Sequence, residues 1–178
     1  MQLKISNVCA CVQLNKSVSL SQVLVNFPDA CYVGNNYKFK SIKVILKNFN
    51  GTAMISSNGK IVLVGCDSVL GAEEYALFLF ATLEGLSPSN FRISNIVCTA
   101  YTPYRIRLDL LHKYLVSYGR KATYEPEIDA PCINIKYLLG TARMYRTGNM
   151  IITGAKSQQN VMKIFTSLVN DLKSYINK

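Results

Sequence analysis

The stretch "ISNVCACV" (residues 5–12) returns near the middle of the chain as "ISNIVCTA" (93–100). A second pair follows the same pattern, since "NGKIVLVGCDS" (58–68) matches "TGNMIITGAKS" (147–157). The offset is 88 for the asparagines (95 − 7) and 89 for the glycines of the second pair (154 − 65). Similar segments that keep their spacing to within one residue indicate an internal duplication. We therefore expect two related half-domains, residues 1–88 and 89–178, instead of an array of short repeats.

Length and composition indicate a globular chain. With 178 residues and 49% hydrophobic content, the chain is long enough to bury a core. No apolar run reaches the ~18–20 residues of a membrane helix, so no membrane association is expected. The N-terminus has no basic segment followed by an uninterrupted apolar stretch, so no signal peptide is expected.

Cysteine and histidine usage argues against a metal centre. The six cysteines show no Cys-x-x-Cys spacing, and His112 is the one histidine of the sequence. Cys9 and Cys11 read as small packing residues of one strand face. We expect reduced thiols in an intracellular compartment, with no cofactor and no small-molecule substrate.

Charge is distributed unevenly between the two halves. The net charge is +10; residues 1–88 carry 7 lysines and 5 acids (+2), whereas residues 89–178 carry 13 basic residues and 5 acids (+8). A strongly basic chain favours a polyanionic partner such as nucleic acid.

Each half reads as a strand, a helix, several strands and a long helix. In the first half, strands are expected over 3–14, within 39–47 and across the hairpin 51–65, with a helix over 18–27. Asp67 or Ser68 is expected to cap a helix that ends near Leu83, before Gly85 and Pro88. In the second half Ser157 takes the cap position, and an apolar stripe follows it: Val161, Ile164, Phe165, Leu168 and Leu172.

Two further expectations concern the segment "RLDLLHKYL" (107–115). His112 is expected on the surface of a helix. Arg107 and Asp109 are two residues apart, a spacing that does not bring side chains together on a helix.

The hairpin strands carry apolar or uncharged residues on both faces. One face holds Ala53, Ile55, Ile61, Leu63 and Gly65, and the other holds Thr52, Met54, Val62 and Val64. In the second half, Met150 and Ile152 oppose Ile151 and Thr153. Helices on both sides of the sheet would explain this pattern, but two helices per half cover one face of a five-stranded sheet. The other face is then open and apolar, which favours a binding surface.

An apolar face and a basic chain together suggest the minor groove of DNA. Minor-groove proteins place small apolar and amide side chains on the groove floor and insert apolar wedges between base steps. Asparagine can donate to the acceptors that A·T pairs present there. Asn7 and Asn95 occupy equivalent positions of the two halves, and we expect them to meet near a pseudo-twofold axis that matches duplex DNA.

These features resemble the core domain of the TATA-box-binding protein family along essentially the whole chain. The resemblance rests on "NVCACVQL" (7–14) and "NIVCTA" (95–100), on the two glycine-containing hairpins, on "RLDLL" (107–111), and above all on "YEPE" (124–127) followed by "TGAK" (153–156). It implies an α+β saddle, in which two pseudo-symmetric repeats form a curved ten-stranded antiparallel sheet with four helices on the convex face. The chain looks like a divergent member, of viral or deeply branching origin.

The resemblance also implies which residues contact DNA. Asn7 and Asn95 match the central asparagines, and Lys60 matches a phosphate contact. Thr52 lies on the same strand face, and Met54 and Arg143 fall where the family has apolar residues. The remaining groove-floor positions are Cys9, Val62, Val64, Val97, Ile151 and Thr153.

The wedges are where the chain departs from the family pattern. The family has two intercalating phenylalanines in each half. Here Phe39 occupies one position and Ser56 the other in the first half. In the second half Tyr145 occupies one, and the other falls on Asp129 or Ala130. We therefore expect weaker kinking of DNA.

The resemblance implies a non-enzymatic transcription initiation factor. It would bind A/T-rich promoter DNA in the nucleus, or in a cytoplasmic viral factory, and recruit a transcription factor IIB-like protein and RNA polymerase. Glu125 and Glu127 match the contact to the IIB-like protein. The alternative is an interaction module of the transcription machinery that keeps the fold but binds DNA weakly. The motifs that would indicate an enzyme are absent: no phosphate-binding loop, no His-Glu-x-x-His and no Gly-x-Ser-x-Gly.

Overall fold

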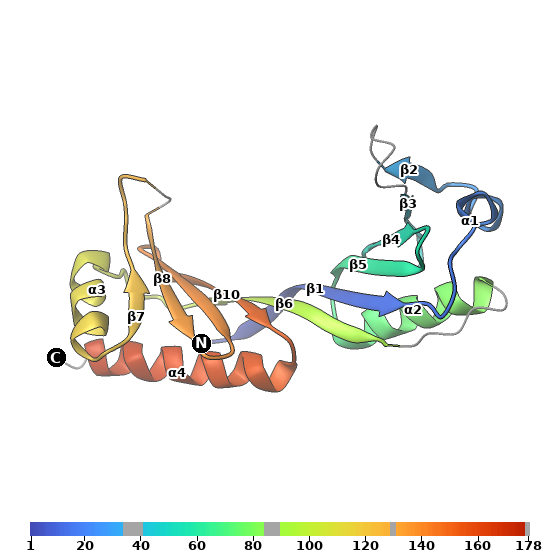
Figure 1. The fold of residues 1–178 in the computed structure, drawn as a ribbon. Coiled ribbons are helices and arrows are strands. Elements are labelled where there is room, and N and C mark those ends of the chain that lie inside the picture. The colour runs from blue at the N-terminus through green and yellow to red at the C-terminus, as the bar shows by residue number, and fades with distance from the viewer. Residues whose placement is uncertain (34–40, 84–89, 129–130, 177–178) are drawn as a thin grey trace. The chain divides into compact units, whose positions relative to one another are not determined.

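The computed structural model describes residues 1–33, 41–83, 90–128 and 131–176, which form two compact units (Figure 1). We call Asn7–Ser94 the N-unit, and Met1–Ser6 together with Asn95–Lys178 the C-unit. The first six residues therefore pack with the second repeat. The two predicted halves, 1–88 and 89–178, do not take this exchange of strand ends into account.

The elements of the first repeat are β1 (Leu3–Gln13), α1 (Leu20–Asn26), β2 (Cys31–Val33), β3 (Ser41–Val44), β4 (Thr52–Ser56), β5 (Lys60–Cys66) and α2 (Val69–Thr82). Those of the second are β6 (Arg92–Tyr101), α3 (Leu108–Ser117), β7 (Lys121–Thr123), β8 (Cys132–Tyr137), β9 (Gly140–Tyr145), β10 (Asn149–Ala155) and α4 (Gln158–Ile176).

The strands form one ten-stranded sheet across the described residues, in the order β2-β3-β4-β5-β1-β6-β10-β9-β8-β7. Neighbouring strands within each unit are antiparallel. With four helices in the same described ranges and the same element order in both repeats, the predicted α+β fold class is confirmed.

Symmetry between the repeats extends to single hydrogen bonds. Ser6 Oγ donates to the carbonyl of Val97 at 3.1 Å within the C-unit, and Ser94 Oγ donates to the carbonyl of Cys9 at 3.1 Å within the N-unit. The two serines are 88 residues apart (94 − 6), and so are the two acceptors (97 − 9), which is the offset between the repeats. The duplicated Ile-Ser-Asn sequence therefore makes the same local contact in each copy.

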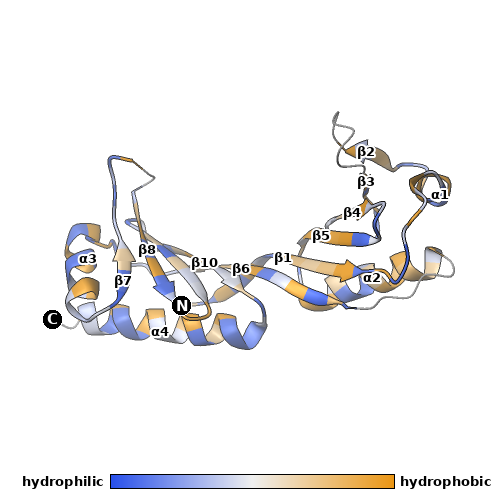
Figure 2. Cartoon of the chain, in the orientation of Figure 1, coloured by the Kyte–Doolittle hydropathy of each residue, from blue (hydrophilic) through white to orange (hydrophobic). Residues whose placement is uncertain are grey.

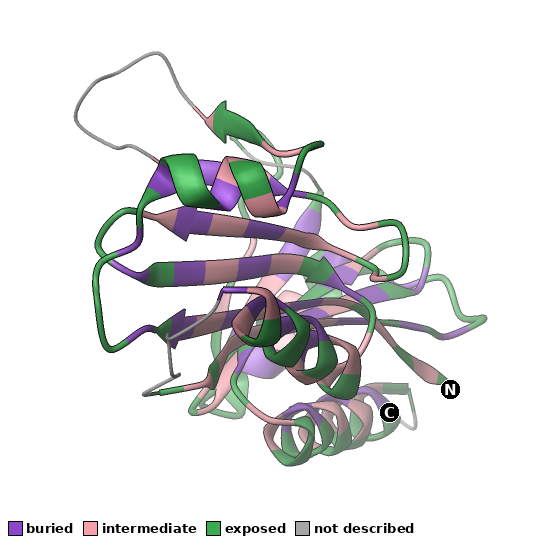
Figure 3. Ribbon diagram, turned by 90° about the vertical axis from the view of Figure 1, so that its right-hand side faces the viewer, coloured by how far each residue is buried: buried purple, intermediate pink, exposed green. Residues whose placement is uncertain are grey.

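Helices cover one face of each unit's strands. In the N-unit α1 packs on β3 and α2 on β5; in the C-unit α3 packs on β7 and β8, and α4 on β9 and β10. The strand residues beneath them are buried, and the alternation along the strands can be followed in Figure 3. The core residues of the N-unit strands are Val8, Ala10, Val12, Ile42, Val44, Ala53, Ile55, Ile61, Leu63 and Cys66.

Both predicted serine caps are confirmed. Ser68 Oγ accepts a hydrogen bond from the Gly71 N–H at 2.9 Å, and Ser157 Oγ accepts one from the Asn160 N–H at 3.1 Å. These bonds satisfy backbone donors that the first helical turn leaves free. Asp67, the other predicted candidate, instead accepts from the Asn50 side chain at 2.7 Å, a bond that lowers the pKa of its carboxyl. The predicted break at Gly85 and Pro88 lies outside the described residues.

Two expectations for α3 need correction. Arg107 is the N-cap residue and has non-helical backbone angles, so the spacing rule for two helical residues does not apply to it. Its guanidinium lies 3.2 Å from the Asp109 carboxylate. The prediction that these two side chains do not meet was wrong. His112 lies on the helix as expected but is half-buried, with Nε2 3.2 Å from the carbonyl oxygen of Ala122 in β7.

A polar cluster joins α4 to β8 and to the turn before β7. Arg120 donates two hydrogen bonds to Oδ1 of Asp171, at 2.8 and 3.2 Å, and the Tyr137 hydroxyl donates to Oδ2 at 3.0 Å. The Asp171 side chain is 13% exposed. Burial, together with the neighbouring Asp171 carboxylate, raises the pKa of Tyr137, so the phenol remains a donor.

Asp171→Ala is expected to lower the free energy of unfolding by about 2–3 kcal/mol, because it leaves the Tyr137 hydroxyl and the Arg120 guanidinium without their acceptor. Denaturant unfolding followed by circular dichroism would measure the loss. Arg107→Ala, which removes an exposed ion pair, is the control and should have a much smaller effect. Equal losses in the two variants would contradict a structural role for the Asp171 cluster.

Candidate nucleic-acid interface

None of the described elements of the N-unit covers the face of its strands that is turned away from the helices. Its residues are half-buried and alternate with the core residues along each strand. The register aligns one row across four strands: Cys11, Val62, Met54 and Lys43. Thr52 pairs with Val64 in a second row. The predicted grouping of Thr52, Met54, Val62 and Val64 is therefore confirmed, and we call this surface the open face of the N-unit.

The C-unit repeats this arrangement with different chemistry. The equivalent row is Thr99, Ile151, Arg143 and Asn134, and Thr153 pairs with Thr141. Val97, Ile151 and Thr153 are half-buried, whereas Arg143 is exposed. A cation thus stands in the C-unit where the N-unit has Met54.

Asn7 and Asn95 are each locked onto a glycine. Asn7 Oδ1 accepts from the Gly65 N–H at 2.9 Å, and Asn95 Oδ1 accepts from the Gly154 N–H at 2.7 Å. Both glycines have positive φ, +81° and +85°, at irregularities of the β1–β5 and β6–β10 pairings. A backbone N–H can only donate, so the atom facing it must be the amide oxygen. In each unit the amide NH₂ is thereby turned away from the bulge.

The bulge corrects one detail of the expected pattern. Gly65 was assigned to the face of Ala53 and Leu63, but it is exposed, because the bulge interrupts the alternation at this position. The bulge also leaves the Gly65 N–H free of the strand pairing, and this N–H donates to Asn7 Oδ1.

Further residues share the open rows, although none of them was predicted to contact DNA. Cys11 and Thr99 continue the floor positions by one step along β1 and β6, and Lys43 and Asn134 continue the rows by one strand. Strand alternation places Cys11 on the face of Cys9, as a packing residue, and would have placed Thr99 on the face of Val97. Lys43 and Asn134 needed the register between strands, which the sequence alone does not give.

Two cationic side chains lie at the margin of the open face of the N-unit. Lys60 is exposed at the start of β5 and lines a cavity of about 420 Å³ with Cys11, Gln13, Phe91 and Arg92. Arg92 therefore adds a second positive charge beside Lys60, which had been predicted as a phosphate contact.

Ser56 and Tyr145 occupy the same place in the two repeats. Each is the last residue of its strand. Its main-chain carbonyl accepts a hydrogen bond at 3.0 Å from the N–H of the glycine in the following turn, Gly59 or Gly148. Both are half-buried on the open side of their strands, opposite Ser41 and Cys132. Tyr145 thus presents a ring where Ser56 presents a hydroxymethyl group. Phe39, Asp129 and Ala130, the other predicted wedge positions, lie outside the described residues.

Glu125 and Glu127 lie on the connection from β7 to β8, and both are exposed. The Ile128 N–H closes this turn on the Glu125 carbonyl at 3.2 Å, and the Ile128 side chain is 84% exposed. In the described part of the C-unit, Asp109 and Asp171 are ion-paired, whereas neither glutamate forms a salt bridge. The two carboxylates and the adjacent isoleucine form a small acidic and apolar projection, of which Ile128 was not predicted.

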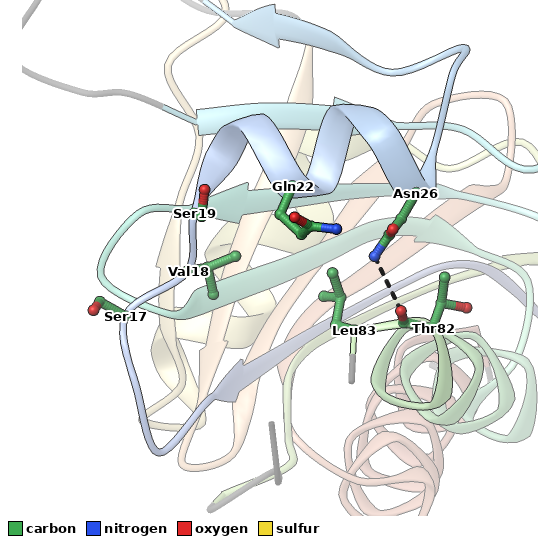
Figure 4. A pocket seen from close by; sticks show the side chains of 7 residues that line it. All are labelled: Ser17, Val18, Ser19, Gln22, Asn26, Thr82 and Leu83. Carbon is green, nitrogen blue, oxygen red and sulfur yellow. Dashed lines mark hydrogen bonds between the residues drawn. The ribbon is translucent and has the colours of Figure 1, made fainter. Parts of the chain in front are cut away.

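A cavity on the helix side of the N-unit and the cysteine thiols are further candidates for reactive groups. A cavity of about 490 Å³ between α1 and the end of α2 is lined by uncharged side chains, and Asn26 donates to the Thr82 carbonyl at 3.1 Å across it (Figure 4). No cluster of three or more potential metal ligands occurs among the described residues. The six cysteines are free thiols. Burial raises the pKa of Cys66 and of Cys98, which favours the protonated, unreactive form.

No helix in the described ranges is both long enough and apolar enough to span a membrane.

Comparison with known proteins places the chain among transcription factors. It is 28% identical to the TATA-box-binding protein of Tetrahymena thermophila over 98% of this chain and 71% of that protein. It is 27% identical to the TATA-box-binding protein of Spodoptera frugiperda, with 97% and 56% covered. The TATA-box-binding protein-like 1 of Entamoeba histolytica is 28% identical, with 97% and 80% covered. The chain thus spans between about half and four fifths of the length of these relatives.

The fold agrees with a solved structure. Methanococcus jannaschii TBP superposes with a TM-score of 0.79 at 20% identity, covering 98% of this chain and 99% of that one. The family described as "Transcription factor TFIID (or TATA-binding protein, TBP)" matches residues 2–86 and again residues 90–175, once for each repeat. The chain therefore belongs to the TATA-binding protein family, whose members are non-enzymatic transcription factors.

Proposed function

We propose that this protein is a transcription initiation factor that binds A/T-rich promoter DNA in the minor groove through the open faces of its two units. The observation that carries the proposal is the pair of oriented asparagines. Each amide oxygen is held by a glycine N–H, so each NH₂ points away from the bulge on a surface of otherwise small or apolar side chains. The Asn7 NH₂ donates one hydrogen to Cys9 Sγ at 3.7 Å, which leaves its second hydrogen to donate to a base.

The chemistry of this surface suits A·T pairs. Their minor-groove edges carry the acceptors adenine N3 and thymine O2, whereas a G·C pair adds the donor guanine N2. An asparagine NH₂ would bond to the former and oppose the latter. Val62, Val64, Val97 and Ile151 offer apolar surface for the groove floor.

Positive charge supports the same partner. Lys60 and Arg92 lie where a phosphate backbone would pass, at the margin of the N-unit floor. Arg143 lies within the row of the C-unit, and cations inserted into a minor groove favour the narrow groove of A-tracts. The two repeats therefore differ in how they would read their half of the site.

Recruitment forms the second part of the proposal. The unpaired Glu125 and Glu127 and the exposed Ile128 are suited to a transcription factor IIB-like protein with a basic and apolar contact surface. RNA polymerase would follow through that factor, and the site of action would be the nucleus.

The proposal is tested by titrating labelled A/T-rich and G/C-rich duplexes at several salt concentrations. We expect preference for the A/T-rich duplex, with log K falling as salt rises, at a slope of roughly −0.9 for each phosphate contacted. Failure to bind either duplex at low salt would overturn the proposal and favour the alternative, an interaction module that keeps the fold without binding DNA by itself.

Ser56→Phe is expected to increase both the DNA bend and the lifetime of the complex. The wild-type residue supplies almost no apolar volume to hold a base step open, whereas a ring at this position would help to offset an unstacking cost of a few kcal/mol. End-to-end FRET on a labelled duplex would measure the bend. Tyr145→Ser, the matched change in the other repeat, should reduce it. A bend that neither variant alters would show that these positions are not wedges.

A further inference from the structure

Helix α2 exposes an apolar surface that the fold does not require. Ala72, Tyr75, Ala76 and Leu79 form the face buried on the sheet. The opposite face carries Leu70 and Leu77, which are 70% and 64% exposed, with the exposed Ala81 one turn further on. Phe78, 44% exposed, lies at its edge and packs against Phe49 with ring centroids 5.3 Å apart.

The equivalent helix of the second repeat, α4, has a different outer face. With the 89-residue offset, Leu70, Glu74, Leu77 and Ala81 correspond to Gln159, Lys163, Thr166 and Asn170 of α4. All four α4 residues are polar, and all four are exposed. The difference in hydropathy between the two helices can be followed in Figure 2. At these four positions α4 turns polar side chains to solvent, whereas α2 has two leucines and an alanine; α4 exposes Met162 where α2 has Glu73.

Charge indicates what would cover the surface. Glu73 and Glu74 lie between Leu70 and Leu77, and α2 contains no lysine or arginine. Within the described residues neither glutamate forms a salt bridge. In a chain of net charge +10, this helix is a local acidic and apolar patch. DNA would be repelled by it. A second copy packed through the same face about a twofold axis would bring glutamates against glutamates.

We propose that the outer face of α2, formed by Leu70, Glu73, Glu74, Leu77 and Ala81, is a docking surface for an amphipathic helix that carries lysine or arginine beside its apolar stripe. Leucines spaced by seven residues match the recurrence of such a stripe, so two helices can pack along their length. The basic residues of the partner would pair with the two glutamates, which would fix partner choice more than they would raise affinity.

The test uses two synthetic helical peptides with the same leucine stripe, one flanked by lysines and one by glutamates, and the full-length protein. Fluorescence anisotropy should show the lysine peptide binding roughly tenfold or more tightly than the glutamate peptide. Leu70→Gln combined with Leu77→Thr, which introduces the equivalent α4 residues, should weaken binding of the lysine peptide by a similar factor. Glu74→Lys should reverse the preference between the peptides. Gln159→Ala with Thr166→Ala on α4 is the matched control and should change nothing.

The leucine double variant should retain wild-type DNA binding, which separates this surface from the open faces of the sheet. Equal binding of the two peptides, or no binding of either, would overturn the proposal. So would a wild-type dimer in sedimentation that the leucine double variant converts to a monomer, because the occupant would then be a second copy.

Discussion

Replacing Asn7 and Asn95 together by alanine is expected to abolish most of the preference for A/T-rich over G/C-rich duplexes. A well-placed contact to a base edge contributes about 1–3 kcal/mol of discrimination, so the pair would contribute about 2–6 kcal/mol if the two positions act independently. Each single variant should lose about half of that preference. Non-specific binding should change little, because Lys60 and Arg92 remain.

Alanine also removes the acceptor for the Gly65 and Gly154 N–H groups, so a second substitution is needed to separate base contact from bulge structure. Asn7→Asp and Asn95→Asp keep an oxygen for each glycine but replace the NH₂ donor by an acceptor. These variants should fold as the wild type and bind A/T-rich DNA worse than the alanine variants. Asn170→Ala, on the exposed side of α4, is the control. Equal loss on both duplexes would contradict a role in reading base edges.

The order of strands and helices could be predicted from the sequence because its signals are local and duplicated, whereas the ten-stranded saddle was implied by the resemblance to the family. Strand alternation separated Ala53, Ile55, Ile61 and Leu63 from the open face, since side chains of a strand point to opposite sides. Serine before an apolar helical stripe marked the starts of α2 and α4. The duplication then doubled the weight of each observation.

What could not be predicted depends on contacts between distant residues. The orientation of the Asn7 amide is set by Gly65, 58 residues away. Gly65 lies at a bulge that the alternation of apolar and polar residues along the strand does not predict. The ion pair of Arg107 and Asp109 depends on the helix beginning one residue after Arg107. The outer face of α2 was missed for a third reason. Apart from Glu73 and Glu74, α2 is apolar around its whole circumference, so the pattern does not indicate which side is buried.

Reversing the charge of the β7–β8 projection, by Glu125→Arg with Glu127→Arg, is expected to abolish recruitment of the IIB-like protein while leaving DNA binding intact. The two carboxylates are exposed and lack salt bridges, so their loss should not disturb the fold. A basic partner surface would then face two like charges, which slows the encounter and removes the contact. Added positive charge would also raise non-specific affinity for DNA slightly.

The measurement is a gel-shift titration in which purified IIB-like protein from the same genome is added to the preformed complex with A/T-rich DNA. The double variant should form the binary complex and show no ternary band at concentrations that saturate the wild type. Asp29→Arg, at an exposed acid on the connection from α1 to β2, is the control for charge alone. This variant should still form the ternary complex. Ile128→Ala should weaken the ternary complex without a change of charge, because an apolar side chain exposed to this extent gains most from being covered. An undiminished ternary band with the double variant would place the IIB-like contact on another surface of the protein.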